Sequence, residues 1–210
     1  MVYDEKELAV MDSIIARYPR ARSSIMPLLH YVQSLEGFVT HDGIELIAAK
    51  LNLATAEVSA VSSFYTQYKR KPVGEYHVGV CTNTLCAVMG GDAIFAALKE
   101  HLDIENDGVT VDGKVSLEHI ECNAACDYAP VVMANWEFYD NQTVESAKIL
   151  VDGARAGNPP APTRGPDVLP TWKENSAVLA GLNDGRAFEG VQAGEPSLLG
   201  LKISKKAGLS

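Results

Sequence analysis

The sequence lacks any apolar run that could cross a membrane, and it has fewer basic residues than acidic ones. No stretch approaches the roughly 18 uninterrupted apolar residues of a membrane-spanning helix. The first residues, Met-Val-Tyr-Asp-Glu-Lys-Glu, have neither the basic segment nor the apolar core of a signal peptide. We therefore expect a cytoplasmic protein without direct membrane insertion. The net charge of −9 argues against nucleic acid as a partner, because phosphates require a basic face.

Several redox motifs are also missing. The chain has no Cys-x-x-Cys pair, which a dithiol oxidoreductase needs, and no Cys-x4-Cys-x2-Cys run of the plant-type ferredoxins. A Rieske centre would need two ligating histidines beside its cysteines. None of the five histidines stands next to a cysteine, and we expect all of them to be surface or packed residues: His30, His41, His77, His101 and His119.

Four cysteines in two close pairs are the most informative feature that is present. Cys81 and Cys86 are separated by four residues, Cys122 and Cys126 by three, and the two pairs by thirty-five. In a reducing compartment such cysteines are expected as metal ligands rather than as disulfides. Four thiolates select either an iron–sulfur cluster or zinc. The spacing leaves zinc open, but gaps longer than two residues and the flanking residues favour iron.

Each pair is predicted to follow a strand. The segment 76–80 reads as a strand that projects Cys81 into a loop, after which Cys86 enters the start of a helix. The segment 115–120 delivers Cys122 in the same way. Backbone amides in such loops and in a first helical turn have no partner within the helix, and the helix dipole there favours an anion. Both loops therefore suit a negatively charged cluster.

Small and polar residues around the cysteines leave some roles open. The small residues of the second loop would let peptide N–H groups approach sulfur closely. Asn83 and Asn123 either add side-chain donors to sulfur or bond their own backbone, as asparagines in turns commonly do. Gly90 and Gly91 either allow a tight turn of the backbone or simply mark the start of the next helix.

The order of the predicted elements divides the chain into three parts. Residues 1–70 read as a small helical domain. Asp4 with Glu7, and Thr40, are placed to cap helix starts, and Gly37 lies where a left-handed C-terminal cap belongs. Residues 71–152 read as an α/β domain with a strand, a helix, two strands and a closing helix. Its predicted elements are strands at 76–80, 115–120 and 131–134 continuing toward Phe138, and helices at 92–102 and 143–151.

Residues 153–210 differ in kind from the body of the chain. They hold six of the ten prolines and nine of the seventeen glycines, and seven basic against five acidic side chains. The body up to residue 152 holds 22 acidic and only 11 basic side chains. We expect an extended tail that forms no core and gains order by wrapping a partner.

The two cysteine segments, taken together, resemble a known family. Cys-Thr-Asn-Thr-Leu-Cys, followed thirty-five residues later by Cys-Asn-Ala-Ala-Cys-Asp-Tyr-Ala-Pro, is similar to the thioredoxin-like 2Fe-2S ferredoxins. More narrowly, it resembles the subunit that pairs with the flavoprotein in the NADH-oxidising module of respiratory complex I, NADH:quinone oxidoreductase. The resemblance runs from about Tyr3 to Gly153 and includes the segment 58–65.

The resemblance implies a fold, a cofactor and partners. The fold would be thioredoxin-like with a helical domain before it, and one 2Fe-2S cluster would be held by Cys81, Cys86, Cys122 and Cys126. FMN and NADH would bind the flavoprotein subunit, not this chain, which has no G-x-G-x-x-G and no phosphate-loop motif of its own. The chain would pass single electrons to and from that FMN, within the peripheral arm on the cytoplasmic side of the membrane. No NADH turnover is expected from this chain alone.

Three departures from the family pattern stand beside this resemblance. Leu85 replaces the proline that often precedes the second ligand, and Asn123-Ala124-Ala125 stands where glycine is common. The tail beyond Gly153 is longer than usual. Two alternatives stay open: a diaphorase subunit of an NAD-linked hydrogenase or formate dehydrogenase, and a zinc-binding interaction module with four cysteine ligands.

Overall fold

The computed structural model describes residues 3–209, which form two compact units. A helical unit holds the described residues up to Val73 together with Pro170–Asp184. A sheet unit holds Gly74–Leu169 and the described residues from Gly185 onward. Every helix within residues 3–209 is too short or too polar to pass through a lipid bilayer.

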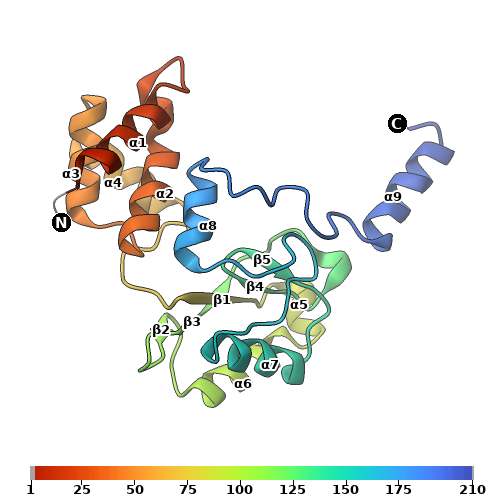
Figure 1. Cartoon of the computed structure of the whole chain (residues 1–210). Helices are drawn as coiled ribbons and strands as arrows, with labels where there is room; N and C mark the ends of the chain where they lie inside the picture. The colour runs from red at the N-terminus through yellow and green to blue at the C-terminus, as the bar shows by residue number, and fades with distance from the viewer. Residues whose placement is uncertain (1–2, 210) are drawn as a thin grey trace. The chain divides into compact units, whose positions relative to one another are not determined.

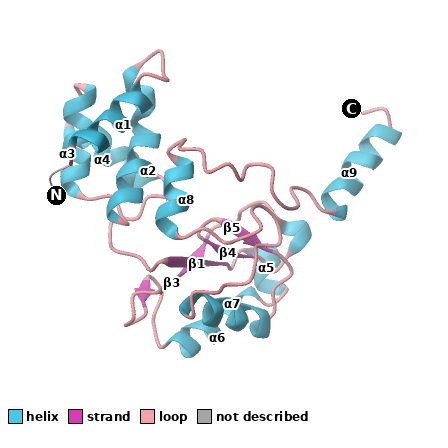
Figure 2. Ribbon diagram, viewed as in Figure 1, coloured by secondary structure: helices cyan, strands magenta, loops and turns pink. Residues whose placement is uncertain are grey.

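The helical unit is built from α-helices and one short 3-10 turn, and its helices are labelled in Figures 1 and 2. These are α1 (Glu5–Ile15), η1 (Ala21–Ser24), α2 (Ile25–Glu36), α3 (His41–Leu51), α4 (Thr55–Phe64) and α8 (Trp172–Leu179). The sheet unit contains β1 (Tyr76–Cys81), α5 (Thr84–Val88), α6 (Gly91–Leu102), β2 (Gly108–Val109), β3 (Val115–Ile120), η2 (Cys126–Tyr128), β4 (Val132–Ala134), β5 (Glu137–Tyr139), α7 (Val144–Arg155) and α9 (Glu195–Lys206).

Local capping explains where the first helices begin and end. Asp4 and Glu7 form the capping box predicted for α1, each side chain accepting a hydrogen bond from the backbone N–H of the other residue. Thr40 caps α3 by accepting from the N–H of Gly43 at 3.0 Å. Gly37 ends α2 in the left-handed conformation, with φ of 88°. These predictions from the sequence are confirmed.

The segment after residue 153 contributes to both cores. Trp172, at the start of α8, is 2% exposed, and its Nε1 donates to the carbonyl oxygen of Gly37 at 2.7 Å. Ala180 belongs to the core of the helical unit, and Leu169 belongs to that of the sheet unit. The expectation that this segment joins no core is therefore wrong for these residues. Leu169, Trp172 and Ala180 look isolated in the sequence, but each fills a place in a core that earlier residues build.

The sheet unit has a mixed five-stranded sheet in the order β2-β3-β1-β4-β5. Strands β1 and β3 are parallel, and all the other neighbours are antiparallel. Helices α6 and α7 pack against each other and against the strands, on one side of the sheet (Figure 1). On β1, Tyr76, Val78 and Val80 belong to this helix-covered core. Because side chains alternate along a strand, Cys81 falls on the opposite face.

The expected strands are found, with two differences. The segment 131–138 is not one strand but the hairpin β4–β5, which turns at Asn135 and Trp136 with φ of 49° and 69°. A two-residue turn with both φ angles positive fits the twist of a hairpin. The turn was missed because tryptophan occupies the second position, where glycine is the usual signal. Strand β2, of only two residues, was also not predicted.

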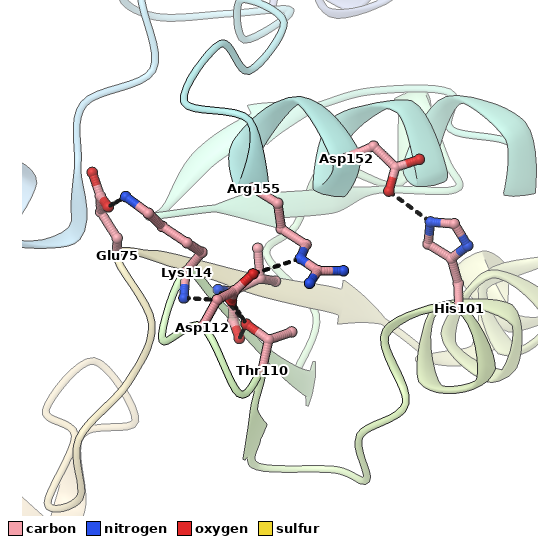
Figure 3. A network of polar contacts seen from close by, with 8 residues as sticks. Glu75, His101, Thr110, Asp112, Lys114, Asp152 and Arg155 are labelled. Carbon is pink, nitrogen blue, oxygen red and sulfur yellow. Dashed lines mark hydrogen bonds and ion pairs between the residues drawn. The ribbon is translucent and has the colours of Figure 1, made fainter.

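A polar network fastens the end of the sheet unit at which β1 and β3 begin (Figure 3). The Asp112 carboxylate accepts from the Thr110 hydroxyl and from the Lys114 backbone N–H, and Arg155 Nε donates to it at 2.9 Å. Lys114 also forms an ion pair with Glu75. The network joins the β2–β3 loop to the end of α7. Because β1 and β3 are parallel, it lies at the opposite strand ends from the cysteines.

Candidate metal centre

The parallel pairing of β1 and β3 brings the two cysteine loops to one edge of the sheet. Cys81 is the last residue of β1 and lies opposite Ile120, the last residue of β3, in the strand register. Cys122 follows Ile120 after one intervening residue. Both loops therefore leave the sheet side by side. Each follows a strand, as the sequence predicted, but their neighbouring positions come from the strand register.

The first pair is buried. Cys81 is 2% exposed, and Cys86 is 3% exposed within the short helix α5. This helix begins at Thr84, so that Cys86, its third residue, lies in the first turn, as predicted. Burial raises the pKa of the Cys81 thiol to about 11; a hydrogen bond from the Asn83 backbone opposes that rise, and the thiols of Cys86 and Cys122 add to it.

The second pair is exposed and closely spaced. The Sγ atoms of Cys122 and Cys126 lie 3.7 Å apart. Two sulfurs on one tetrahedral metal, each at about 2.3 Å, lie about 3.8 Å apart. The backbone N–H of Ala124 donates to Cys122 Sγ at 3.3 Å, so an amide of the second loop reaches sulfur as the small residues there suggested. Ala124 adopts the left-handed conformation, with φ of 57°.

The two pairs converge without merging into one four-ligand centre. The pKa of Cys126 is raised, first by its contact with Cys122 and further by the nearby Cys81 and Asp127. Cys81 is therefore an electrostatic neighbour of both members of the second pair. Within residues 3–209, no three side chains among histidine, cysteine, aspartate and glutamate are arranged as ligands of one metal ion. The arrangement is one of two adjacent cysteine pairs, and the sulfur separation in the second pair suits one metal ion.

Asparagine side chains organise the loops rather than bonding sulfur. The Asn83 side chain reaches from the first loop to the carbonyl oxygen of Ile120 at 3.3 Å. With its amide turned over, it would instead join the Glu121 carboxylate, at 3.2 Å, to the N–H of Cys122, at 3.0 Å. Either orientation ties the first loop to the second. Asn123 Nδ2 donates to the nearby Glu121 carbonyl oxygen at 3.4 Å, which is the local bonding expected of an asparagine in a turn.

The two glycines before α6 have different roles that spacing could not separate. Gly90 has φ of 116°, a conformation that L side chains rarely adopt, and makes the turn into α6. Gly91 is needed for close approach: a Cβ there would lie 2.4 Å from the carbonyl oxygen of Cys81 and 2.9 Å from that of Cys86. The start of α6 thus packs directly on the backbone that carries the buried pair.

An apolar cluster lines the sheet face below the cysteines. Ile120, Val131, Met133 and Tyr128 pack with Cys81 and Cys86 on the face opposite the helix-covered core. Such surroundings limit access of water to a metal site and so influence its redox potential. The sequence pattern did not identify these residues, because they come from the end of β3, from η2 and from residues 131–133, which only the folded sheet brings beside Cys81.

The buried histidines have other surroundings. The ring of His77 is held by Ser116 and Glu118, each at 2.9 Å. His30 is buried in the helical unit beside the ring of Tyr68, and burial lowers its pKa to about 4. Both are packed residues, as expected, and neither joins the four cysteines.

Comparison with known proteins agrees with this geometry. Residues 11–155 match the family described as thioredoxin-like 2Fe-2S ferredoxin. An NADH-quinone oxidoreductase subunit of Mycobacterium bovis is 59% identical over 194 residues, covering 92% of this chain and 77% of the relative. The corresponding protein of Rickettsia bellii, which has the same name, is 39% identical over 156 residues, covering 73% of this chain and 93% of the relative.

A solved structure shares the fold. The crystal structure of an NAD+-reducing NiFe-hydrogenase in the air-oxidised state matches with a TM-score of 0.55 and 18% identity, over 63% of this chain and 23% of that one. The paired cysteines at one sheet edge, the family match over most of the chain and the two relatives lead to one conclusion. The chain belongs to the thioredoxin-like 2Fe-2S ferredoxin family, in the branch that contains these subunits of NADH-quinone oxidoreductase.

Proposed function

We propose that Cys81, Cys86, Cys122 and Cys126 hold one 2Fe-2S cluster, with the two sulfurs of each pair on one iron. The observation that carries this proposal is the 3.7 Å separation of the Cys122 and Cys126 sulfurs, next to a second thiol pair at the same sheet edge. Four thiolates are the usual ligand set of such a cluster. When bound, the cluster supplies a carrier for one electron at a time.

The surroundings of the two pairs assign them different tasks. The buried pair, Cys81 and Cys86, anchors the cluster to the sheet and shields it from water. The exposed pair, Cys122 and Cys126, lies on the side where an electron can enter or leave by way of a partner. The N–H of Ala124 stabilises negative charge on Cys122, whereas the carboxylates of Glu121 and Asp127 oppose the addition of an electron.

The electron partner that fits this chain is a flavoprotein subunit carrying FMN and NADH. The chain would then be the electron-transfer subunit of NADH:quinone oxidoreductase, in a membrane-bound complex on its cytoplasmic side, without NADH turnover of its own. Support comes from the 59% identity to a relative named as a subunit of NADH-quinone oxidoreductase and from the absence of dinucleotide motifs in the sequence. The similarity to the hydrogenase concerns the fold alone.

A metal analysis combined with paramagnetic resonance tests the cluster. The full chain, purified without oxygen, should contain iron and sulfide in equal amounts and give a 2Fe-2S signal when it is reduced. Cys122→Ser should lose or disorder this signal, because a hydroxyl is a harder ligand than a thiolate. Val88→Ser, a change at an exposed residue of α5, is the matched control and should keep it. Stoichiometric zinc without sulfide would instead establish the zinc module.

We also propose that the part of the tail carrying α9 binds the partner. The helix contains no buried residue, and it exposes large apolar side chains. These are Leu198, Leu199, Leu201 and Ile203. Deletion of everything after Gly153 would not test this role cleanly, because it would also remove Trp172 and Leu169 from the two cores.

Point variants on the exposed face separate docking from folding. The double variant Leu199→Ser/Ile203→Ser should keep the unfolding temperature but weaken co-purification with the flavoprotein. Val111→Ser changes a fully exposed valine at the far strand ends and is the control. Normal affinity of the double variant for the flavoprotein would contradict the docking role.

A further inference from the structure

Arg164, which lies beyond the residues matched by the family, makes a largely buried ion pair near the second cysteine loop. Its Nε and Nη2 donate to the two oxygens of Asp140, at 2.8 Å and 2.9 Å. The side chains of Arg164 and Asp140 are 17% and 6% exposed. A fork-to-fork contact of this kind fixes the orientation of the guanidinium group as well as its position.

Two aromatic rings hold the same guanidinium group. Its Cζ lies 4.0 Å from the centre of the Phe138 ring and 4.7 Å from that of Tyr128. Arginine within about 6 Å of an aromatic ring is attracted to it electrostatically, more strongly where water is excluded. Arg164 is thus fixed by three side chains: Asp140, Phe138 and Tyr128.

The backbone around Arg164 belongs to the same arrangement. Arg164 forms a bridge with Phe138 at the edge of β5, and the N–H of Thr163 donates to the Phe138 carbonyl oxygen at 2.8 Å. The Thr163 hydroxyl donates to Asp140 at 2.9 Å. The segment 163–164 therefore adds a short edge contact to the sheet, which fixes Arg164 relative to β5.

Tyr128 connects this arrangement to a proposed ligand. It is the last residue of η2, whose first residue is Cys126, and its N–H donates to the Ala125 carbonyl oxygen at 3.0 Å. Its carbonyl oxygen accepts from the N–H of Asn141 at 2.8 Å. A ring held at one end of a three-residue turn limits how the other end, with the sulfur of Cys126, can move.

We propose that Arg164 is a positioning residue for Cys126, acting through the ring of Tyr128. The inference rests on the proposed role of Cys126 as a cluster ligand. Asp140 offsets the charge of Arg164, so the effect comes from geometry and not from added positive charge near the cluster. Lysine cannot replace arginine in this role, because an ammonium group offers neither the planar fork nor the stacking face.

The test compares Arg164→Gln and Arg164→Lys with the wild-type full chain. Arg155→Gln is the matched control: it breaks another arginine–aspartate pair of the same unit, at the opposite strand ends (Figure 3). Three properties are measured: hydrogen exchange of the amides of residues 125–128 in the metal-free chain, the resonance spectrum and midpoint potential of the cluster, and the rate of cluster loss to an iron chelator. Arg164→Lys retains the charge and serves as the milder change if Arg164→Gln does not fold.

Both Arg164 variants should exchange faster at residues 125–128 but not at 84–88, and should change the spectrum and potential. Loss of a charge-assisted contact corresponds to about a tenfold to hundredfold change in an opening equilibrium, so cluster loss should accelerate by at least about tenfold. Arg155→Gln should match the wild type. Wild-type exchange in both Arg164 variants would overturn the proposal, and so would faster exchange with an unchanged spectrum and potential. A wild-type chain without a cluster signal would instead refute the proposed function itself.

Discussion

Replacing Gly91 with alanine should damage the buried cysteine pair without touching a sulfur. The added Cβ would lie 2.4 Å from the carbonyl oxygen of Cys81, 2.9 Å from that of Cys86 and 3.0 Å from the carbonyl carbon of Cys86. The optimal separation of such atoms is about 3.5 Å, so the Cys81 carbonyl would have to retreat by roughly 1 Å. All three atoms belong to the backbone, which has no rotamer by which to move away.

The energetic cost follows from this geometry. Overpacking usually costs about 1–3 kcal/mol, and a clash with the backbone on two sides belongs near the upper end, at about 2–3 kcal/mol. At roughly 2–4 °C per kcal/mol for a chain of this size, the unfolding temperature should fall by about 4–12 °C. Cluster content should fall as well, because the displaced carbonyl belongs to a proposed ligand.

Circular dichroism during heating and iron and sulfide analysis measure the two effects on the full chain. Gly200→Ala is the matched control, since a Cβ at this position of α9 meets no atom within 4 Å. This control should unfold at the wild-type temperature or slightly above it, because alanine favours a helix. If Gly91→Ala unfolds within about 2 °C of the wild type and binds as much iron, then the close approach of α6 to the cysteine backbone limits neither stability nor cluster content, and the prediction is refuted.

Three further changes test other parts of the structure. The Thr110 hydroxyl, followed by the Lys114 backbone and Arg155, lowers the pKa of Asp112 to about 2, so its stabilising effect is complete above pH 4 and is lost as the pH falls toward 2. Asp112→Asn should remove this acid dependence from the urea midpoint; an unchanged profile between pH 4 and 2 would contradict it. Burial lowers the pKa of His30 to about 4, so between pH 6.5 and 4 the unfolded chain binds a proton at this residue that the folded chain does not bind. The free energy of unfolding should therefore fall by about 3 kcal/mol as the pH falls through this range. His30→Phe should remove that loss, whereas an equally steep wild-type and variant profile would argue against it. Ala124→Gly should raise the stability of the metal-free chain by about 0.5–1 kcal/mol, measured by urea unfolding, because it relieves a left-handed alanine; a lower midpoint would show that the alanine is not strained.

The sequence predicted the elements whose signals are local. The cap at Asp4 and Glu7, the left-handed Gly37 and the strand Val115–Ile120 each depend on residues close in the chain, and each was found where expected. The β4–β5 hairpin was not predicted, because Trp136 occupies a turn position at which glycine is the usual signal. The burial of Trp172 was missed for a different reason. Its hydrogen-bond partner, Gly37, lies more than a hundred residues away in the sequence, and composition does not reveal such a contact.

For the candidate site, the sequence by itself determined the chemistry: four thiols in two pairs, after two strands, with small residues between the second two. Only the tertiary structure decided which surroundings those thiols have. The parallel register of β1 and β3 places both pairs at one edge, burial separates Cys81 and Cys86 from the exposed pair, and Gly91 packs on their backbone. The physical reason is that spacing along the chain shows only which ligands are available. The burial of the thiols, the approach of Gly91 to their backbone and the contact of Arg164 with Tyr128 form between segments that meet only after folding.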